Sequence, residues 1–532
     1  MKKLLSLILA ASLAFSLCGC GSETLQESET SSVTTTEEVA VSETLSTASE
    51  ETITAIAEEK TYTYEAVSEK YPDKTVLTIA ISSQIADYSS IIEKANEYLD
   101  SLDKDYVICF RTVQRETIQY SDIVSYPDFN GPVEEIITSG EKLDILCVTD
   151  YRDAVERGLL INLDDLIDGT EVGNHLKVSL PDNIFRSVTI DGSIYGINCY
   201  EAISLSAGIL VNAELADKYG YDCEKSLLEQ IDILRTVATN ESDCETLVSF
   251  VTLYAPSYYI SEQTLTDGVY WDDTEKVAKS ILDNEDYITW LKTIYTLNRE
   301  ELLTYVDNSY KSEIFAYESP LRLMGSGNGI KFPIGYTYSN GLFTTSYMNS
   351  YTSYSVEYQL SKASQAVGIC KSSGNIEYAF DFITLIFTDE SMNNIMCYGD
   401  YESIICEDGR VDSQSVTSAF VAMFGNDLIR TPTTCELSDR TEIFAKAVEN
   451  AFVSEDFDFM FDDTSVATEC GNVIAVITEM ASALDNNILD TSKYPTFDEY
   501  ISDFRNLLEE AGINDIIAEA NRQYVEWRES QQ

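Results

Sequence analysis

The sequence predicts an α/β fold with a parallel sheet and more than one domain. First, 532 residues are enough for two or more domains with cores of their own. Second, β-branched runs alternate with helically spaced apolar residues between positions 75 and 148. Strand–helix–strand alternation of this kind builds a doubly wound parallel sheet. Third, the composition changes at Lys74, where the folded part is expected to begin.

The N-terminus predicts export and anchoring. Met1-Lys2-Lys3 is basic, and the apolar run Leu4–Leu17 is shorter than a membrane span. The following Leu17-Cys18-Gly19-Cys20 resembles the bacterial lipobox. The resemblance implies that residues 1–20 are a signal peptide, that Cys20 carries the lipid, and that the protein is held at the extracellular face of the cell membrane. A plain cleaved secretion signal is the alternative.

The next segment, residues 21–72, predicts a disordered tether. It is rich in Ser, Thr and Glu and lacks the clustered apolar residues of a core. Five elements are then expected in order: strand 75–81, helix 91–102, strand 106–112, a helix beginning at 133–137, and strand 143–148. Ligands of such sheets lie beyond the carboxyl ends of the strands, which places residues 149–152 at the rim.

The stretch 191–212 predicts a passage between two lobes. Asp191-Gly192 is a turn signal, followed by a short strand broken by Gly196 and a second apolar strand that ends at Asn212. Tyr200 and Glu201 lie at their junction, and ligands are commonly held at domain interfaces. An ordinary hairpin in a mixed sheet is the alternative.

Composition excludes several classes of protein. The net charge of −57 argues against nucleic acid and against an anionic membrane surface as partners. His175 is the one histidine, so histidine-dependent triads and multi-histidine metal sites are excluded, and we expect no metal and no cofactor. None of the 12 cysteines forms a C-x-x-C pair, and several lie in apolar runs, which predicts mostly free thiols.

Four segments, in this order, resemble the extracellular solute-binding lipoproteins of ABC importers, especially the sugar-binding group related to maltose-binding proteins. The segments are SGEKLDILCVTDYRDAVERGLLINLDDLI, DGSIYGINCYEAISLSAGILVNAELADKYG, AVGICKSSGNIEYAFDFITLIFTDESMNNIMCY and FDEYISDFRNLLEEAGINDIIAEANRQYVEW. Asn198 departs from the proline usual there. The resemblance implies a two-lobed, periplasmic-binding-protein-like (type II-like) fold whose discontinuous lobes are joined by a hinge. Lobe 1 would comprise 73–200 and 364–400, and lobe 2 would comprise 201–363 and 401–480. The C-terminal helices in 481–532 would pack on lobe 1.

The resemblance also implies a function. Lobe closure would capture a carbohydrate for ABC permease subunits, the protein would be a monomer, and no bond would be made or broken. Ring faces of a sugar suit aromatic side chains, and its hydroxyls suit charged and amide groups. Carrying over positions one at a time gives these ligand-binding residues: Asp150, Tyr151, Arg152, Tyr200, Glu201, Tyr254, Tyr258, Tyr317, Ser319, Tyr336 and Tyr338.

Each of these residues has a structural alternative. Asp150 could cap the following helix, Arg152 could lie on a solvated helix face, and Glu201 could pair with a lysine. Any of the tyrosines could be a packing residue. Three other functions also remain open: binding of an oligopeptide or other polar solute, a lipid-anchored carbohydrate hydrolase with paired carboxylates, and a surface adhesin.

Overall fold

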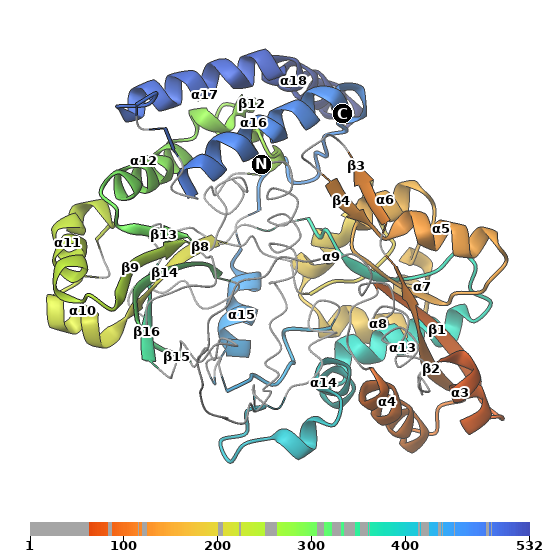
Figure 1. Cartoon of the computed structure of the whole chain (residues 1–532). Coiled ribbons are helices and arrows are strands. Elements are labelled where there is room, and N and C mark those ends of the chain that lie inside the picture. Colours follow the sequence, from red (N-terminus) through yellow and green to blue (C-terminus); the bar gives the residue numbers. More distant parts are fainter. Residues whose placement is uncertain are drawn as a thin grey trace, which may run out of the picture.

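Two sheets, each with its own apolar core, divide the chain into two lobes (Figure 1). This confirms the two-lobed α/β fold. The computed structural model describes residues 63–82, 88–114, 116–119, 125–199, 206–222, 225–249, 263–305, 313–321, 331–334, 346–351, 360, 362–412, 415, 425–434, 438, 440–451, 453–485, 489–490 and 492–531.

Lobe 1 is built on a sheet of order β17-β5-β1-β2. Its strands are β1 (Thr75–Ser82), β2 (Tyr106–Val113), β5 (Ile145–Val148) and β17 (Ala366–Ile369). β1 pairs in parallel with β2 and β5, as the alternating pattern predicts, whereas β17 is antiparallel to β5. Buried Asp144 ties the sheet together, because its carboxylate accepts hydrogen bonds from Thr78 N (3.0 Å), Ser373 Oγ (2.7 Å) and Asn375 Nδ2 (3.1 Å).

Two short hairpins and helices from two separate parts of the chain complete the described part of lobe 1. A short hairpin of β3 (Glu116–Gln119) and β4 (Ser125–Asp128) was not predicted. The turn Asp191-Gly192 is confirmed: both residues have positive φ (49° and 79°), and they join β6 (Thr189–Ile190) to β7 (Ser193–Ile194). The helices are α3 (Tyr64–Lys70), α4 (Ser89–Ser101), α5 (Asn130–Thr138), α6 (Tyr151–Glu156), α7 (Asp164–Gly169), α8 (Glu171–Ser179), α9 (Asp182–Val188), α13 (Ile376–Thr388), α14 (Glu390–Tyr398) and α15 (Arg440–Glu449).

Lobe 2 contains a mixed six-stranded sheet of order β13-β9-β14-β8-β16-β15 and a small antiparallel sheet β10-β11-β12. The strands of the larger sheet are β8 (Ser206–Asn212), β9 (Cys244–Ser249), β13 (Leu303–Tyr305), β14 (Glu313–Leu321), β15 (Lys331–Ile334) and β16 (Ser346–Tyr351). The smaller sheet comprises β10 (Thr264–Thr266), β11 (Val269–Asp272) and β12 (Val277–Ser280). The helices are α10 (Ala213–Tyr219), α11 (Ile231–Asn240) and α12 (Glu285–Arg299), with 3-10 turns at 228–230 and 281–283.

The C-terminal helices α16 (Ala467–Asp485), α17 (Phe497–Ala511) and α18 (Ile513–Ser530) belong to lobe 2 (top of Figure 1). Their apolar faces, which include Phe504 and Ile516, share one core with Trp271 and Trp290. The prediction that 481–532 pack on lobe 1 is therefore wrong. The amphipathic pattern identified the buried faces of these helices but carried no information on which lobe receives them.

A second boundary also needs correction. Residues 401–480 were assigned to lobe 2, but Phe444, Val448 and Phe457 pack in the core of lobe 1, and lobe 2 resumes only at Phe459. The described chain therefore crosses between the lobes three times: after Cys199, before Leu360, and between Phe457 and Phe459. The sequence predicted the first two crossings and missed the third.

Candidate functional site

The three crossings lie side by side. The first and second pair through mutual backbone hydrogen bonds between Ile197 and Val367 (2.9 and 3.0 Å). The side-chain amide of buried Asn198 donates to the carbonyl of Gln365. This hydrogen bond is the structural role of Asn198, which stands where the solute-binding proteins usually have proline. Gly196 is required here, because a Cβ would lie 2.9 Å from Ala366 Cβ and 3.0 Å from the carbonyl of Val367.

The second and third crossings are joined by Lys362. Its ammonium donates to Asp458 Oδ1 (3.0 Å) and to the carbonyl of Thr189 (2.8 Å), and it lies 4.4 Å from the centroid of the Phe457 ring. Burial lowers the pKa of Lys362, while Asp458 acts in the opposite direction. Arg186 of α9 stacks on the same ring at 5.3 Å. No pattern in the sequence signals this contact, because its members lie far apart along the chain.

Asp150 lies at the carboxyl end of β5, where the rim was predicted. It caps α6, since Oδ1 accepts a hydrogen bond from Asp153 N at 3.1 Å. Asn130 fixes the turn by donating to the carbonyl of Asp150 and to Asp153 Oδ2, both at 2.8 Å. Burial raises the pKa of Asp150. The capping alternative is thus confirmed, and it occupies one of the two carboxylate oxygens.

Tyr151 is a structural residue, and its predicted role as a stacking ring is wrong. Its side chain is only 1 % exposed and packs in an apolar cluster of lobe 1. The hydroxyl donates to the carbonyl of Val188 and accepts from Tyr195 N, both at 2.9 Å. A buried ring with a satisfied hydroxyl has no surface left for a ligand.

Arg152 reaches across the junction. Its Nε donates to Glu156 Oε1 (2.7 Å), and its Nη1 donates to the carbonyl of Phe461 (2.6 Å), whose side chain lies in the core of lobe 2. The side chain is 36 % exposed. The guanidinium is therefore engaged in an interlobe contact, which neither the binding hypothesis nor the solvated-face alternative predicted.

Most other predicted ligand residues lie outside the described part of the chain: Tyr200, Glu201, Tyr254, Tyr258, Tyr336 and Tyr338. Cys20 also lies outside it. Tyr317 and Ser319 lie on β14, an inner strand of the larger lobe 2 sheet, where Tyr317 pairs with Leu210 and Ser319 with Gly208.

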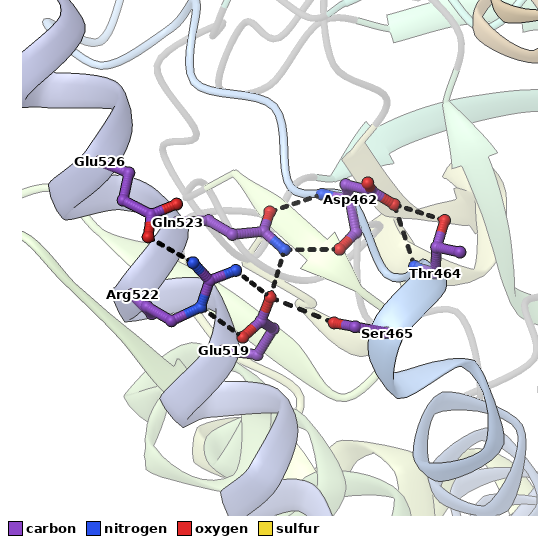
Figure 2. A network of polar contacts seen from close by, with 7 residues as sticks. All are labelled: Asp462, Thr464, Ser465, Glu519, Arg522, Gln523 and Glu526. Carbon is purple, nitrogen blue, oxygen red and sulfur yellow. Dashed lines mark hydrogen bonds and ion pairs between the residues drawn. The ribbon is translucent and has the colours of Figure 1, made fainter.

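At the C-terminal end of the third crossing, a polar network joins the chain around Asp462 to α18 (Figure 2). The Gln523 amide exchanges two hydrogen bonds with the backbone of Asp462 (2.9 and 2.7 Å) and also donates to Glu519 at 2.9 Å. Hydrogen bonds from Arg522, Gln523 and Ser465 hold the pKa of Glu519 down at about 2. The network anchors the crossing to lobe 2.

Within the described ranges, no group of three or more His, Cys, Asp or Glu side chains is placed to hold a metal ion. None of the helices in that part of the chain combines the length and apolar content that a bilayer span requires.

Comparison with known structures identifies the fold as that of the extracellular solute-binding proteins. The N-glycan transport solute-binding protein of Streptococcus pneumoniae matches with a TM-score of 0.64 and 16% identity, over 86% of this chain and 100% of that one. The same protein in complex with Man5GlcNAc matches at 0.56. An extracellular solute-binding protein of Bifidobacterium longum subsp. infantis matches at 0.52 and 14% identity, over 85% and 98% of the two chains.

Sequence comparison adds one local match. Residues 457–529 match a family described as a domain of unknown function, DUF3502. No curated protein sequence matches the chain. The family segment begins at Phe457, within the third crossing.

Proposed function

We propose that this protein is an extracellular solute-binding protein that captures a carbohydrate between its lobes and delivers it to the permease subunits of an ABC importer. The observation that carries the proposal is the likeness over most of the chain to a protein of N-glycan transport that has been solved with Man1GlcNAc and Man5GlcNAc. The chain crossings provide the hinge about which two lobes can close. A lipid on Cys20 would hold the protein at the cell surface, as a monomer that makes and breaks no bond.

In this proposal Asp150 offers its second carboxylate oxygen to a sugar hydroxyl, while the first caps α6. Glu201 and Tyr200 would contribute from the first crossing, and Tyr317 and Ser319 from β14. Tyr254, Tyr258, Tyr336 and Tyr338 would complete the aromatic surface. Arg152 would close one end of the site, and Tyr151 is no longer included because it is buried.

The test is a thermal-unfolding screen of the full chain against neutral oligosaccharides that contain mannose and GlcNAc, maltooligosaccharides, fructans, oligopeptides and polyamines. A ligand at about 100 times its Kd stabilises the folded state by ~2.7 kcal/mol, which raises Tm by several degrees. A shift with one class of oligosaccharide is expected. A shift with peptides or polyamines alone would assign another ligand class, and release of sugar from a chromogenic glycoside would establish the hydrolase.

A pair of matched variants then tests the site. Asparagine is as good an N-cap as aspartate, so Asp150→Asn keeps the cap of α6. It replaces the second carboxylate oxygen by an NH2 group, which cannot accept a hydrogen bond from a sugar hydroxyl. Since a hydrogen bond to a charged group contributes about 1.5–3 kcal/mol, the variant should bind the carbohydrate roughly 10–100-fold more weakly. The control is Asp389→Asn, at the N-cap of α14 in the same lobe. Equal affinities of the two variants would remove Asp150 from the site.

A further inference from the structure

The third crossing is a strap of seven residues, Asp456 to Asp462, held by both lobes. On the lobe 2 side, buried Asp456 lies 2.8 Å from the Lys276 ammonium and accepts a hydrogen bond from Tyr524 (3.1 Å). The ring of Phe459 packs against those of Trp271, Tyr524 and Trp527, with ring centroids no more than 5.7 Å apart. Gln523 completes the attachment by binding the backbone of Asp462 (Figure 2).

The residues between these anchors contact lobe 1. Phe457 lies under Arg186 and Lys362, Asp458 pairs with Lys362, and Met460 packs against an apolar cluster of lobe 1. The carbonyl of Phe461 accepts the hydrogen bond from Arg152. Contacts to the two lobes thus alternate along the strap, and a rotation of one lobe relative to the other must break contacts on one side of it.

The two sides differ in character. The lobe 2 contacts combine a buried carboxylate, an aromatic cluster and two backbone hydrogen bonds from one amide. The ring of Phe457 is buried in the core of lobe 1. From Asp458 onward, the polar contacts with lobe 1 come from three long cationic side chains, Arg152 (36 % exposed), Arg186 (42 %) and Lys362 (17 %). A partly exposed side chain such as Arg152 can release and re-form its single hydrogen bond to the strap at low cost, whereas the buried aromatic cluster cannot separate without exposing apolar surface.

We infer that the DUF3502 segment is the element that couples the lobes: from Asp458 onward its strap moves with lobe 2, and Arg152 is a latch residue that holds lobe 1 to the strap. The role concerns the arrangement of the lobes without ligand and goes beyond capture of a solute. It also accounts for the position of the family segment, which joins the strap to the three helices that anchor it.

The experiment measures the distance between the lobes in the ligand-free full chain by double electron–electron resonance. Spin labels are attached through unnatural amino acids at Val178 on α8 (83 % exposed) and Val525 on α18 (55 % exposed), because the free cysteines preclude thiol labelling. Arg152→Ala should broaden the distance distribution and shift its mean. The control, Arg157→Ala, removes ion pairs to Glu134 and Asp153 within lobe 1 and should leave the distribution unchanged.

A second pair tests the other side of the strap. Gln523→Ala releases Asp462 and should also broaden the distribution, whereas Arg522→Ala breaks only ion pairs within α18 and should not. Because both positions act through one segment, the double variant Arg152→Ala/Gln523→Ala should exceed the larger single effect by little. Unchanged distributions for Arg152→Ala and Gln523→Ala, with native circular dichroism, would overturn the inference. A failed carbohydrate screen would leave it standing, because no ligand is used.

Discussion

Replacing Tyr151 by phenylalanine separates a structural role from a binding role. The ring stays, so any stacking on a ligand would be preserved, but the hydroxyl is lost. Val188 O loses its donor and Tyr195 N loses its acceptor, both at 2.9 Å in lobe 1. At about 0.5–1.5 kcal/mol for each hydrogen bond, Tyr151→Phe should lower the free energy of unfolding of lobe 1 by roughly 1–3 kcal/mol.

The chain offers a way to assign that loss to one lobe. All three tryptophans, Trp271, Trp290 and Trp527, lie in or against the core of lobe 2. In urea unfolding, tryptophan fluorescence therefore reports lobe 2, and far-UV circular dichroism reports both lobes. Tyr151→Phe should lower the urea midpoint of the dichroism transition that belongs to lobe 1, with carbohydrate affinity unchanged. An unaltered dichroism profile together with weakened carbohydrate binding would refute the structural assignment.

Three further predictions follow from burial and charge. Ending the chain before Phe457 removes the helices that complete the lobe 2 core, so the fluorescence emission of Trp271 and Trp290 should shift to that of an unfolded chain. Native emission would contradict the packing of these helices in lobe 2. Because the folded pKa of Glu519 lies at about 2, below its ordinary 4.5, the carboxylate contributes stability above pH 4.5 that is lost as the pH falls toward 2. The difference in urea midpoint between parent and Glu519→Gln should shrink over that interval, and a constant difference would exclude the ion pair. Burial raises the pKa of the Cys109 thiol to about 12 and that of Cys470 to about 11. Among the described cysteines, only the partly exposed Cys406 should therefore react with a thiol reagent at pH 7, which peptide mapping can measure. Labelling of Cys109 in the native state would argue against the fold.

Local patterns in the sequence predicted local structure well. The strands and helices expected between 75 and 148 were found close to their expected bounds. The free state of the eight described cysteines is also confirmed. Local patterns are less decisive over 277–295: the apolar residues there fit a helix, yet 277–280 form β12 and α12 begins only after Asn284, which caps it. A short apolar run fits both the helical and the strand period, and pairing with neighbouring strands decides which of the two forms.

Long-range placement was the part that sequence could not supply. The pattern around Arg152 fits a helix face, and nothing in it specifies the carbonyl of Phe461, 309 positions away. The same holds for Lys362 and Asp458, whose pairing depends on the order in which the chain crosses between the lobes. Tyr151 was misjudged for a related reason: its position beside the rim was predicted correctly, but burial of its ring depends on the loop around Tyr195.

The path of the chain explains why the strap can act as a coupling element. It follows α15, whose Phe444 and Val448 are buried in lobe 1, and precedes α16, which is built into lobe 2. The chain therefore passes from a helix fixed in lobe 1 to a helix fixed in lobe 2, and lobe 2 holds the short strap between them at Asp456 and Asp462. A seven-residue segment spans at most ~25 Å and cannot absorb a large displacement by slack alone. Rotation of the lobes must then be taken up within the strap or at its contacts to lobe 1, and the contact between Arg152 and Phe461 is a single hydrogen bond from a partly exposed side chain.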